Sequence, residues 1–264
     1  VSKAKAALLT AEQQPEQNKQ TVAAAVNYLA GIRAAQNLDE EAENLYKKSL
    51  AIREQNSGSD SLPAALSLNN LAFFFLGRGR LEEAEPLFIR AKAILEKNEL
   101  NSPTELSTVI ANLAELRFRN RQFQEADALY LNAIEIRERT LGSNHPIVAT
   151  TLGNLAFVRA SEGKYKEAIP LYDRAIAILH HTGLDDSEDG ATLRHNLSEA
   201  LIELGQLLQA EAEVKIALEL RQKYLGQEAL ETIASWKTLG EIRRLAQNLP
   251  GAIMCLQRIE VAAM

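Results

Sequence analysis

The sequence is poor in several residue types, and each shortage excludes a class of protein. It has one cysteine, Cys255, which excludes an intrachain disulfide framework and a cysteine-rich zinc site and fits a reducing compartment such as the cytoplasm. Thirteen glycines and seven prolines fall well below the average share of about 12%. This shortage argues against a turn-rich β-barrel, a collagen-like chain and a disordered linker, and it favours helix.

Long apolar runs and excess positive charge are also missing. The longest apolar run, Leu71 to Leu76, is far shorter than the roughly 18 residues of a membrane span, and the N-terminus has no signal-peptide pattern. The net charge of −6 lacks the basic footprint of a nucleic-acid binder. We therefore expect neither a membrane nor a nucleic acid as partner. Because Val1 is not an initiator methionine, we also expect the chain to be a segment of a longer protein.

What the sequence does contain is an internal repeat of 42 residues. A leucine recurs at this step, at Leu29, Leu71, Leu113, Leu155, Leu197 and Leu239. A small residue follows each of these leucines. A second column is alanine throughout: Ala42, Ala84, Ala126, Ala168, Ala210 and Ala252. Each unit carries two amphipathic helical patterns separated by short breaks rich in Gly, Asn, Ser and Pro. A fixed period of this length predicts a stack of repeated helix pairs.

The small residues have a packing role in this interpretation. They allow the two helices of a unit to approach to about 8–10 Å, while large residues such as Leu71 and Phe88 fill the space on either side. A single helix pair cannot cover both of its apolar faces. Neighbouring pairs are therefore expected to stack into a solenoid with one continuous core.

Several of these strings resemble tetratricopeptide repeats of the 42-residue kinesin light chain type: LNNLA (68–72), GRLEEAEPLF (79–88), LAIRE (50–54) and LGSNHP (141–146). The resemblance covers essentially the whole chain. It implies an all-α fold, a right-handed superhelical solenoid of antiparallel helix pairs, in one domain spanning residues 1–264. The repeats are expected at about 20–61, 62–103, 104–145, 146–187, 188–229 and 230–264. Residues 1–19 align with the second helix of a preceding unit, which makes thirteen helices in all.

The resemblance also implies that the first helices line a concave groove for a peptide or partner protein. Helical geometry places the residue before each repeated leucine on that inner face. In four successive repeats this residue is an asparagine. A carboxamide can both donate to and accept from a peptide backbone. The alternative is that these asparagines join neighbouring helices. The predicted groove residues are Asn70, Phe73, Thr108, Asn112, Glu115, Arg119, Thr150, Asn154, Phe157, Thr192, Asn196, Glu199 and Glu203.

The predicted groove is apolar to mixed in its first half and acidic around Glu199, Glu203 and Glu241. Kinesin light chain grooves are associated with acidic peptides that carry a tryptophan. Because this stripe lacks a basic cluster, that ligand class is not carried over. The glutamates could equally do no more than solvate an exposed face.

Two further patterns accompany the repeat. Odd units share a glycine at Gly58, Gly142 and Gly226, so an 84-residue super-repeat overlies the 42-residue one, unless the similarity is chance drift among degenerate repeats. An arginine column also replaces the more usual aromatic of the family: Arg33, Arg117, Arg159 and Arg243. We expect its guanidinium groups to emerge at helix ends or to pair with Glu41, Glu125 or Glu167.

Signals for catalysis or metal binding are weak. His180 and His181 are adjacent and diverge on a helix, while His145 and His195 have no partner at ligand spacing. Phosphate-binding, serine-hydrolase and zinc-protease motifs are missing. The sequence therefore predicts no catalytic residue, no metal and no cofactor, and Cys255 is interpreted as a small buried residue rather than a nucleophile.

These observations favour a noncatalytic scaffold that binds a peptide or partner protein. The alternative is a regulatory or sensor block of a larger enzyme, with a segment of the parent chain in the groove. The last helical pattern leaves an apolar surface formed by Ile253, Met254, Leu256, Ile259, Val261 and Met264. We expect a following repeat, a partner, or end-to-end self-association to cover it, in that order.

Overall fold

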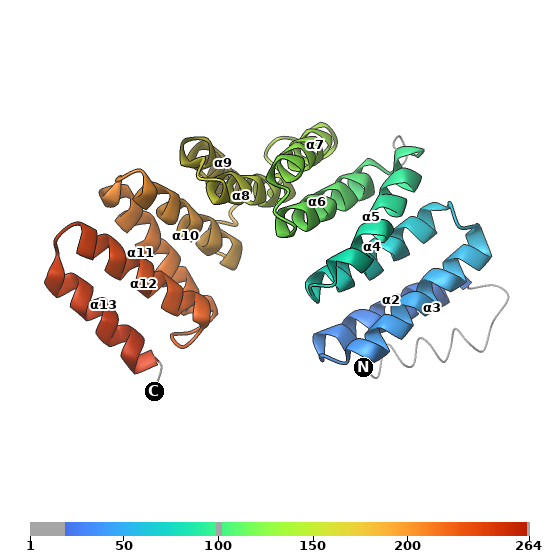
Figure 1. Cartoon of the computed structure of the whole chain (residues 1–264), viewed down its shortest axis with the longest axis horizontal. Helices are drawn as coiled ribbons and strands as arrows, with labels where there is room; N and C mark the ends of the chain where they lie inside the picture. Colours follow the sequence, from blue (N-terminus) through green and yellow to red (C-terminus); the bar gives the residue numbers. More distant parts are fainter. Residues whose placement is uncertain (1–18, 99–101, 263–264) are drawn as a thin grey trace. The chain divides into compact units, whose positions relative to one another are not determined.

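The computed structural model describes residues 19–98 and 102–262, which form twelve α-helices and no strand (Figure 1). The helix expected near residues 1–14 lies outside these ranges. The chain divides into two compact units, Val1–Ala133 and Ile134–Met264. The helices are α2 (Lys19–Ala35), α3 (Asp39–Ser57), α4 (Leu62–Gly77), α5 (Leu81–Glu96), α6 (Pro103–Arg119), α7 (Phe123–Leu141), α8 (Pro146–Ser161), α9 (Tyr165–His181), α10 (Glu188–Glu203), α11 (Leu207–Tyr224), α12 (Leu230–Leu245) and α13 (Leu249–Ala262).

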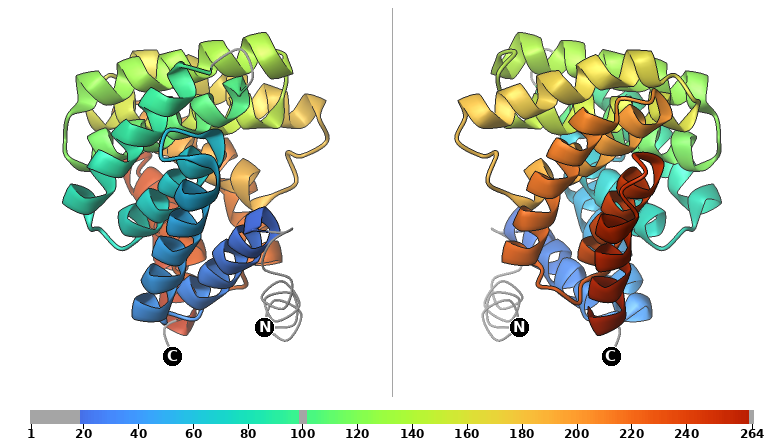
Figure 2. Two further views of the ribbon diagram at one scale, coloured as in Figure 1. Left: turned by 90° about the vertical axis from the view of Figure 1, so that its right-hand side faces the viewer. Right: turned by 90° about the vertical axis from the view of Figure 1, so that its left-hand side faces the viewer.

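Within each unit, helices that follow one another in sequence pack as antiparallel pairs. In the first unit α2 contacts α3 and α4 contacts α5; in the second, α8, α10 and α12 each contact the helix that follows. Figure 2 shows α12 and α13 side by side at the red end of the chain. The first helices of neighbouring pairs also meet, as α2 with α4 and α10 with α12. The expected all-α stack of helix pairs is confirmed.

The repeated small residues lie where helices meet. Ala72 on α4 and Ala84 on α5 are fully buried, and the large neighbour Phe88 is also fully buried. In the last pair, a Cβ at Gly240 would lie 3.3 Å from the Cβ of Cys255, so α12 and α13 approach closely there. The packing role that the sequence suggested for these columns is therefore confirmed.

Short, well-defined turns end the helices. Ser61 and Ser187 cap α4 and α10, where each side chain accepts a hydrogen bond from a backbone N–H three residues later. The α4–α5 turn needs a left-handed residue, which Gly79 supplies at φ 72°.

Buried or half-buried arginines occur on alternate second helices. Arg53 donates to the carbonyl of Pro63 at 3.0 Å, Arg137 donates to the hydroxyl of Thr151, and Arg221 donates to the hydroxyl of Ser235 at 2.7 Å. The intervening helices carry buried Leu95 and Leu179 at the same repeat position. The polar acceptors of the odd repeats also alternate with apolar residues: Ser67, Thr151 and Ser235 correspond to Val109 and Leu193.

The arginine column at the ends of the first helices forms ion pairs. Arg33 pairs with Glu41 at 3.0 Å, Arg117 with Glu125 at 3.0 Å, and Arg159 with Glu167 at 3.8 Å. These are the partners that the sequence predicted.

The last described helix, α13, exposes several apolar side chains. Leu256 is 59% exposed and Val261 is 70% exposed. Cys255, on the opposite face, is fully buried, and burial raises the pKa of its thiol. The prediction of a small buried cysteine is confirmed. No helix within residues 19–98 and 102–262 is both long and apolar enough to span a bilayer.

Candidate functional site

Large apolar side chains stand exposed on the first helices, at or beside the predicted asparagine stripe. Tyr28 of α2 is 67% exposed, Phe73 of α4 is 58% exposed and Phe157 of α8 is 42% exposed. Their neighbours Leu71 and Leu155 point into the core and are buried. On α2, α4 and α8, one face is thus core and the next carries an aromatic side chain in contact with solvent.

In the first unit, Tyr28 and Phe73 line a cavity of about 380 Å³ between α2 and α4. Asn70, Gly31 and the half-buried Tyr46 complete its wall. The predicted residues Asn70 and Phe73 therefore share one concavity. Tyr46 is not among the predicted groove residues and is an addition to the site.

Two asparagines of the first unit join neighbouring first helices. The Asn70 carboxamide donates to the side chain of Asn27 at 3.1 Å, and the Asn112 carboxamide donates to the side chain of Asn69 at 2.9 Å. Both bonds link residues 43 positions apart, so each joins a stripe asparagine to the residue just before the equivalent position of the preceding repeat. The joining role, one of the two alternatives open from sequence, is thus present in this unit.

The other predicted residues of the first unit satisfy one another. Glu115 and Arg119 form an ion pair at 2.7 Å, and Arg119 also donates to the carbonyl of Leu76 at 3.0 Å. Thr108 is half-buried and donates its hydroxyl to the carbonyl of Thr104 at 3.0 Å. The polar groups of this part of the stripe are therefore largely occupied within the chain.

In the second unit, α8 and α10 border a cavity of about 320 Å³. It brings together five predicted residues: Thr150, Asn154, Phe157, Thr192 and Asn196. Gly153 also lines it, at the repeat position where Asn27 and Asn69 receive their hydrogen bonds. Since glycine has no side chain, Asn196 has no acceptor there equivalent to Asn27 or Asn69.

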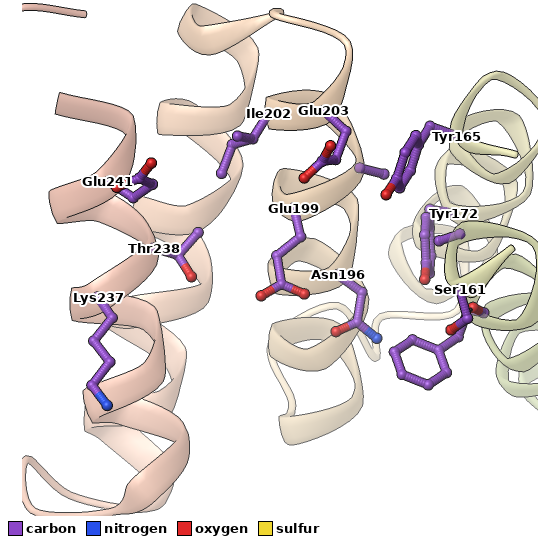
Figure 3. Close-up of a pocket in the computed structure, with 13 residues that line it drawn as sticks. Ser161, Tyr165, Tyr172, Asn196, Glu199, Ile202, Glu203, Lys237, Thr238 and Glu241 are labelled. Atoms are coloured by element: carbon purple, nitrogen blue, oxygen red, sulfur yellow. Dashed lines mark hydrogen bonds between the residues drawn. The ribbon is translucent and has the colours of Figure 1, made fainter. Parts of the chain in front are cut away.

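A second cavity of this unit, about 600 Å³, lies between α8, α9, α10 and α12. It contains the predicted residues Phe157, Asn196, Glu199 and Glu203. Figure 3 shows Tyr165 and Tyr172 of α9 on one side of it, with Glu199 and Glu203 on the neighbouring helix α10. The sequence analysis did not assign the two tyrosines to the site, because it placed the groove along the first helices and both tyrosines lie on α9, a second helix.

Glu199 is held by a chain of buried polar groups. Its carboxylate lies 3.4 Å from Nε2 of the buried His195. Nδ1 of His195 lies 3.4 Å from the Ser235 hydroxyl, which accepts a hydrogen bond from the Arg221 guanidinium. The hydrogen bond from His195 is the main reason that the pKa of Glu199 is lowered. The Glu199 carboxylate is therefore ionised at neutral pH, and its contact with His195 holds it in place.

The Tyr172 hydroxyl is the unusual group of this cavity. Its side chain is fully buried, and its oxygen has no hydrogen bond of normal geometry within the described part of the chain. Burial raises the pKa of Tyr172, with a further rise from Glu199, which the nearby Asn196 carboxamide partly opposes. The hydroxyl is therefore neutral at physiological pH.

The repeat explains why this hydroxyl lacks a partner. In the preceding repeat Tyr130 occupies the same position, and its hydroxyl donates to Glu115 at 3.3 Å. In the repeat of Tyr172, the position of Glu115 is taken by Phe157, which has no acceptor. A signal for this was present in the sequence, in the alternation of Phe and Glu between successive units.

The histidines have structural surroundings. His145 caps α8 by accepting the N–H of Ile147 at 3.2 Å, and His180 lies 2.9 Å from Asp185 on the surface. The described residues contain no group of three His, Cys, Asp or Glu side chains placed to hold a metal ion.

Comparison with known proteins places the fold. Similar solved structures include BtubC (BKLC) from P. vanneervenii, 18% identical, with a TM-score of 0.73 over 89% of this chain and 91% of that one. The kinesin light chain-like repeats of a Podosopora anserina protein are 24% identical, with a TM-score of 0.65 over 77% of this chain and 96% of that one. YrrB, described as a TPR protein with an unusual peptide-binding site, is 17% identical, with a TM-score of 0.53 over 82% of this chain and 91% of that one.

No curated protein sequence matches the chain significantly. At these identities the solved structures show the fold alone, while a family model for the tetratricopeptide repeat matches residues 20–97 and 105–180, more than half of the chain. Together with the 42-residue period and the stacked helix pairs, this match shows that the chain belongs to the tetratricopeptide repeat family.

Proposed function

We propose that this chain is a noncatalytic interaction scaffold that binds a peptide or a segment of a partner protein along its first helices. The observation that carries the proposal is the exposure of aromatic side chains beside cavities on these helices. Phe73 and Phe157 stand at the same position two repeats apart and are both exposed. Exposed aromatic residues of this kind are the usual anchors of protein interfaces.

The polar groups of the second unit complement these anchors. Asn154 is exposed and lies on the stripe beside Phe157, and Asn196 has no neighbouring asparagine to bond. A carboxamide in this setting can donate to and accept from the backbone of an extended peptide. YrrB, which shares the fold, is described as having a peptide-binding site, which makes a peptide ligand a reasonable expectation for this chain.

The test is selection of ligands from a random peptide library displayed on phage, with the purified chain as bait. Affinities of the enriched peptides are then compared between the native chain and Phe157→Ala. We expect a loss of about tenfold or more, since burying a phenylalanine side chain contributes about 1.5–3 kcal/mol.

Leu208→Ala is the matched control, because Leu208 is 88% exposed but lies on α11, a second helix. It should leave affinity unchanged. Selection that enriches no peptide, or peptides that bind both variants equally, would contradict the proposal.

A further inference from the structure

The 600 Å³ cavity of the second unit combines three features that select one kind of ligand group. It has an aromatic wall from α9, carboxylates from α10 and α12, and the unpartnered Tyr172 hydroxyl. We infer that this cavity receives the basic side chain of a bound peptide, arginine in preference to lysine. This inference rests on the proposed function and adds the chemical identity of one ligand residue.

The charges of the cavity favour a cation. Glu203 is exposed and forms no ion pair with the described residues. The ion-pair partner of Glu199 among the described residues is His195, at 3.4 Å. Glu241 forms a two-point ion pair with Arg244 on the same helix, and Lys237 is the one cation that lines the cavity. The lining therefore retains a net negative charge at neutral pH.

The unpartnered hydroxyl distinguishes a binding cavity from glutamates that merely solvate a surface. A buried hydroxyl without a hydrogen bond destabilises the folded state by about 1–3 kcal/mol. An N–H donor that entered from the cavity would supply the missing partner of Tyr172. The carboxylates thus indicate the sign of the ligand, and the hydroxyl indicates that the ligand is also a hydrogen-bond donor.

Arginine fits these acceptors better than lysine. Its planar guanidinium carries five N–H donors and can meet a carboxylate and a hydroxyl together, whereas an ammonium is a compact point charge. The plane can also lie against the Tyr165 or Phe157 ring, which lysine matches less well. All of these acceptors and rings lie within one unit of the chain.

The first experiment uses a defined probe, so it does not depend on finding a natural ligand. N-acetyl-arginine methylamide is titrated into isotopically labelled protein, and the NMR signals of the Asn196 carboxamide and the Tyr172 ring are followed. We expect saturable shifts with the arginine probe, weaker ones with N-acetyl-lysine methylamide, and none with the neutral isostere N-acetyl-citrulline methylamide. Equal responses to arginine and citrulline, or no saturable shift up to millimolar concentrations, would overturn the inference.

Variants locate the effect. Glu203→Gln should lower the affinity for the arginine probe by about fivefold or more. Tyr172→Phe should lower this affinity about threefold while the chain remains folded. Glu219→Gln is the control, since it removes the same charge from an exposed position on α11. If Glu219→Gln weakens binding as much as Glu203→Gln, general charge attraction explains the result and the assigned cavity is wrong.

A second arm separates this inference from the proposed function. Peptides enriched from the random library are resynthesised with each arginine or lysine replaced by citrulline or norleucine. Peptides that depend on Phe157 but tolerate these replacements would refute the basic-residue assignment and leave the scaffold proposal standing. Failure to enrich any peptide would refute the scaffold proposal, while the arginine titration still decides the chemistry of the cavity.

Discussion

Replacing Tyr172 by phenylalanine should stabilise the protein, although it removes a polar group from a fully buried position. The ring would continue to fill its site between α9 and α10, and only the hydroxyl, which has no partner, would be lost. Removing an unsatisfied buried hydroxyl should contribute about 1–3 kcal/mol, and the gap left by one oxygen should offset a few tenths of this. We expect a net gain of about 1 kcal/mol in the free energy of unfolding.

The repeat supplies a matched control for this prediction. Tyr130 occupies the equivalent position in the preceding repeat, but its hydroxyl donates to Glu115. Tyr130→Phe should therefore lose about 1 kcal/mol, the usual net contribution of one hydrogen bond. Urea unfolding measures both variants, with the midpoint rising for Tyr172→Phe and falling for Tyr130→Phe at unchanged m. If both variants lose stability equally, the Tyr172 hydroxyl has a partner and the reasoning about its cavity fails.

The same substitution has a signature at high pH. Burial raises the pKa of Tyr172 above its ordinary value of 10.0, so the folded state keeps this proton where the unfolded chain releases it. This contribution to stability is fully present below pH 10 and decreases as pH rises further, toward the folded pKa. The advantage of Tyr172→Phe over the native chain should therefore grow between pH 9 and pH 11. A constant difference across that range would show that the hydroxyl is not desolvated.

Three other changes test separate features of the fold. Gly190→Ala should destabilise by about 2 kcal/mol or more, because its Cβ would lie 2.3 Å from the Asp185 carbonyl oxygen, whereas Gly77→Ala, with open space around it, should not lower the melting temperature. Asn112→Ala should lower unfolding stability by about 1 kcal/mol through the loss of its bond to α4, and unchanged stability would show that the bond contributes nothing. End-to-end self-association is the third of the three covers expected for the exposed face of α13; if it occurs, the concentration-dependent light scattering of the native chain should disappear in Leu256→Glu, and identical scattering of both proteins at all concentrations would refute it.

Much of this architecture could be predicted from the sequence because the same packing residues recur in every repeat. The buried columns typified by Ala72 and Ala84 depend only on local helix geometry and a fixed period. The pairing of Arg33 with Glu41 follows in the same way, since both residues lie within one repeat. Features that each unit specifies for itself are visible in a single sequence.

The candidate site was harder to predict because it depends on departures from the period. Whether an asparagine joins helices or faces a ligand depends on the residue 43 positions earlier, which is Asn69 for Asn112 and Gly153 for Asn196. Likewise Tyr130 and Tyr172 look equivalent in sequence, and only the neighbouring helix separates a satisfied hydroxyl from an orphan. A second position that differs from repeat to repeat decides these roles: the residue 43 positions earlier for the asparagines and 15 positions earlier for the tyrosines.

The alternation of buried arginine and leucine on the second helices limits how this chain can change its copy number. Arg137 meets Thr151 and Arg221 meets Ser235, whereas the junctions between them carry Leu179 and Leu193. Loss of a single 42-residue unit would set a buried arginine against an apolar neighbour and leave its charge unsatisfied. Loss or duplication of two adjacent units keeps every arginine opposite a polar residue, so this solenoid can be shortened or lengthened only in steps of two repeats without leaving a buried charge unsatisfied.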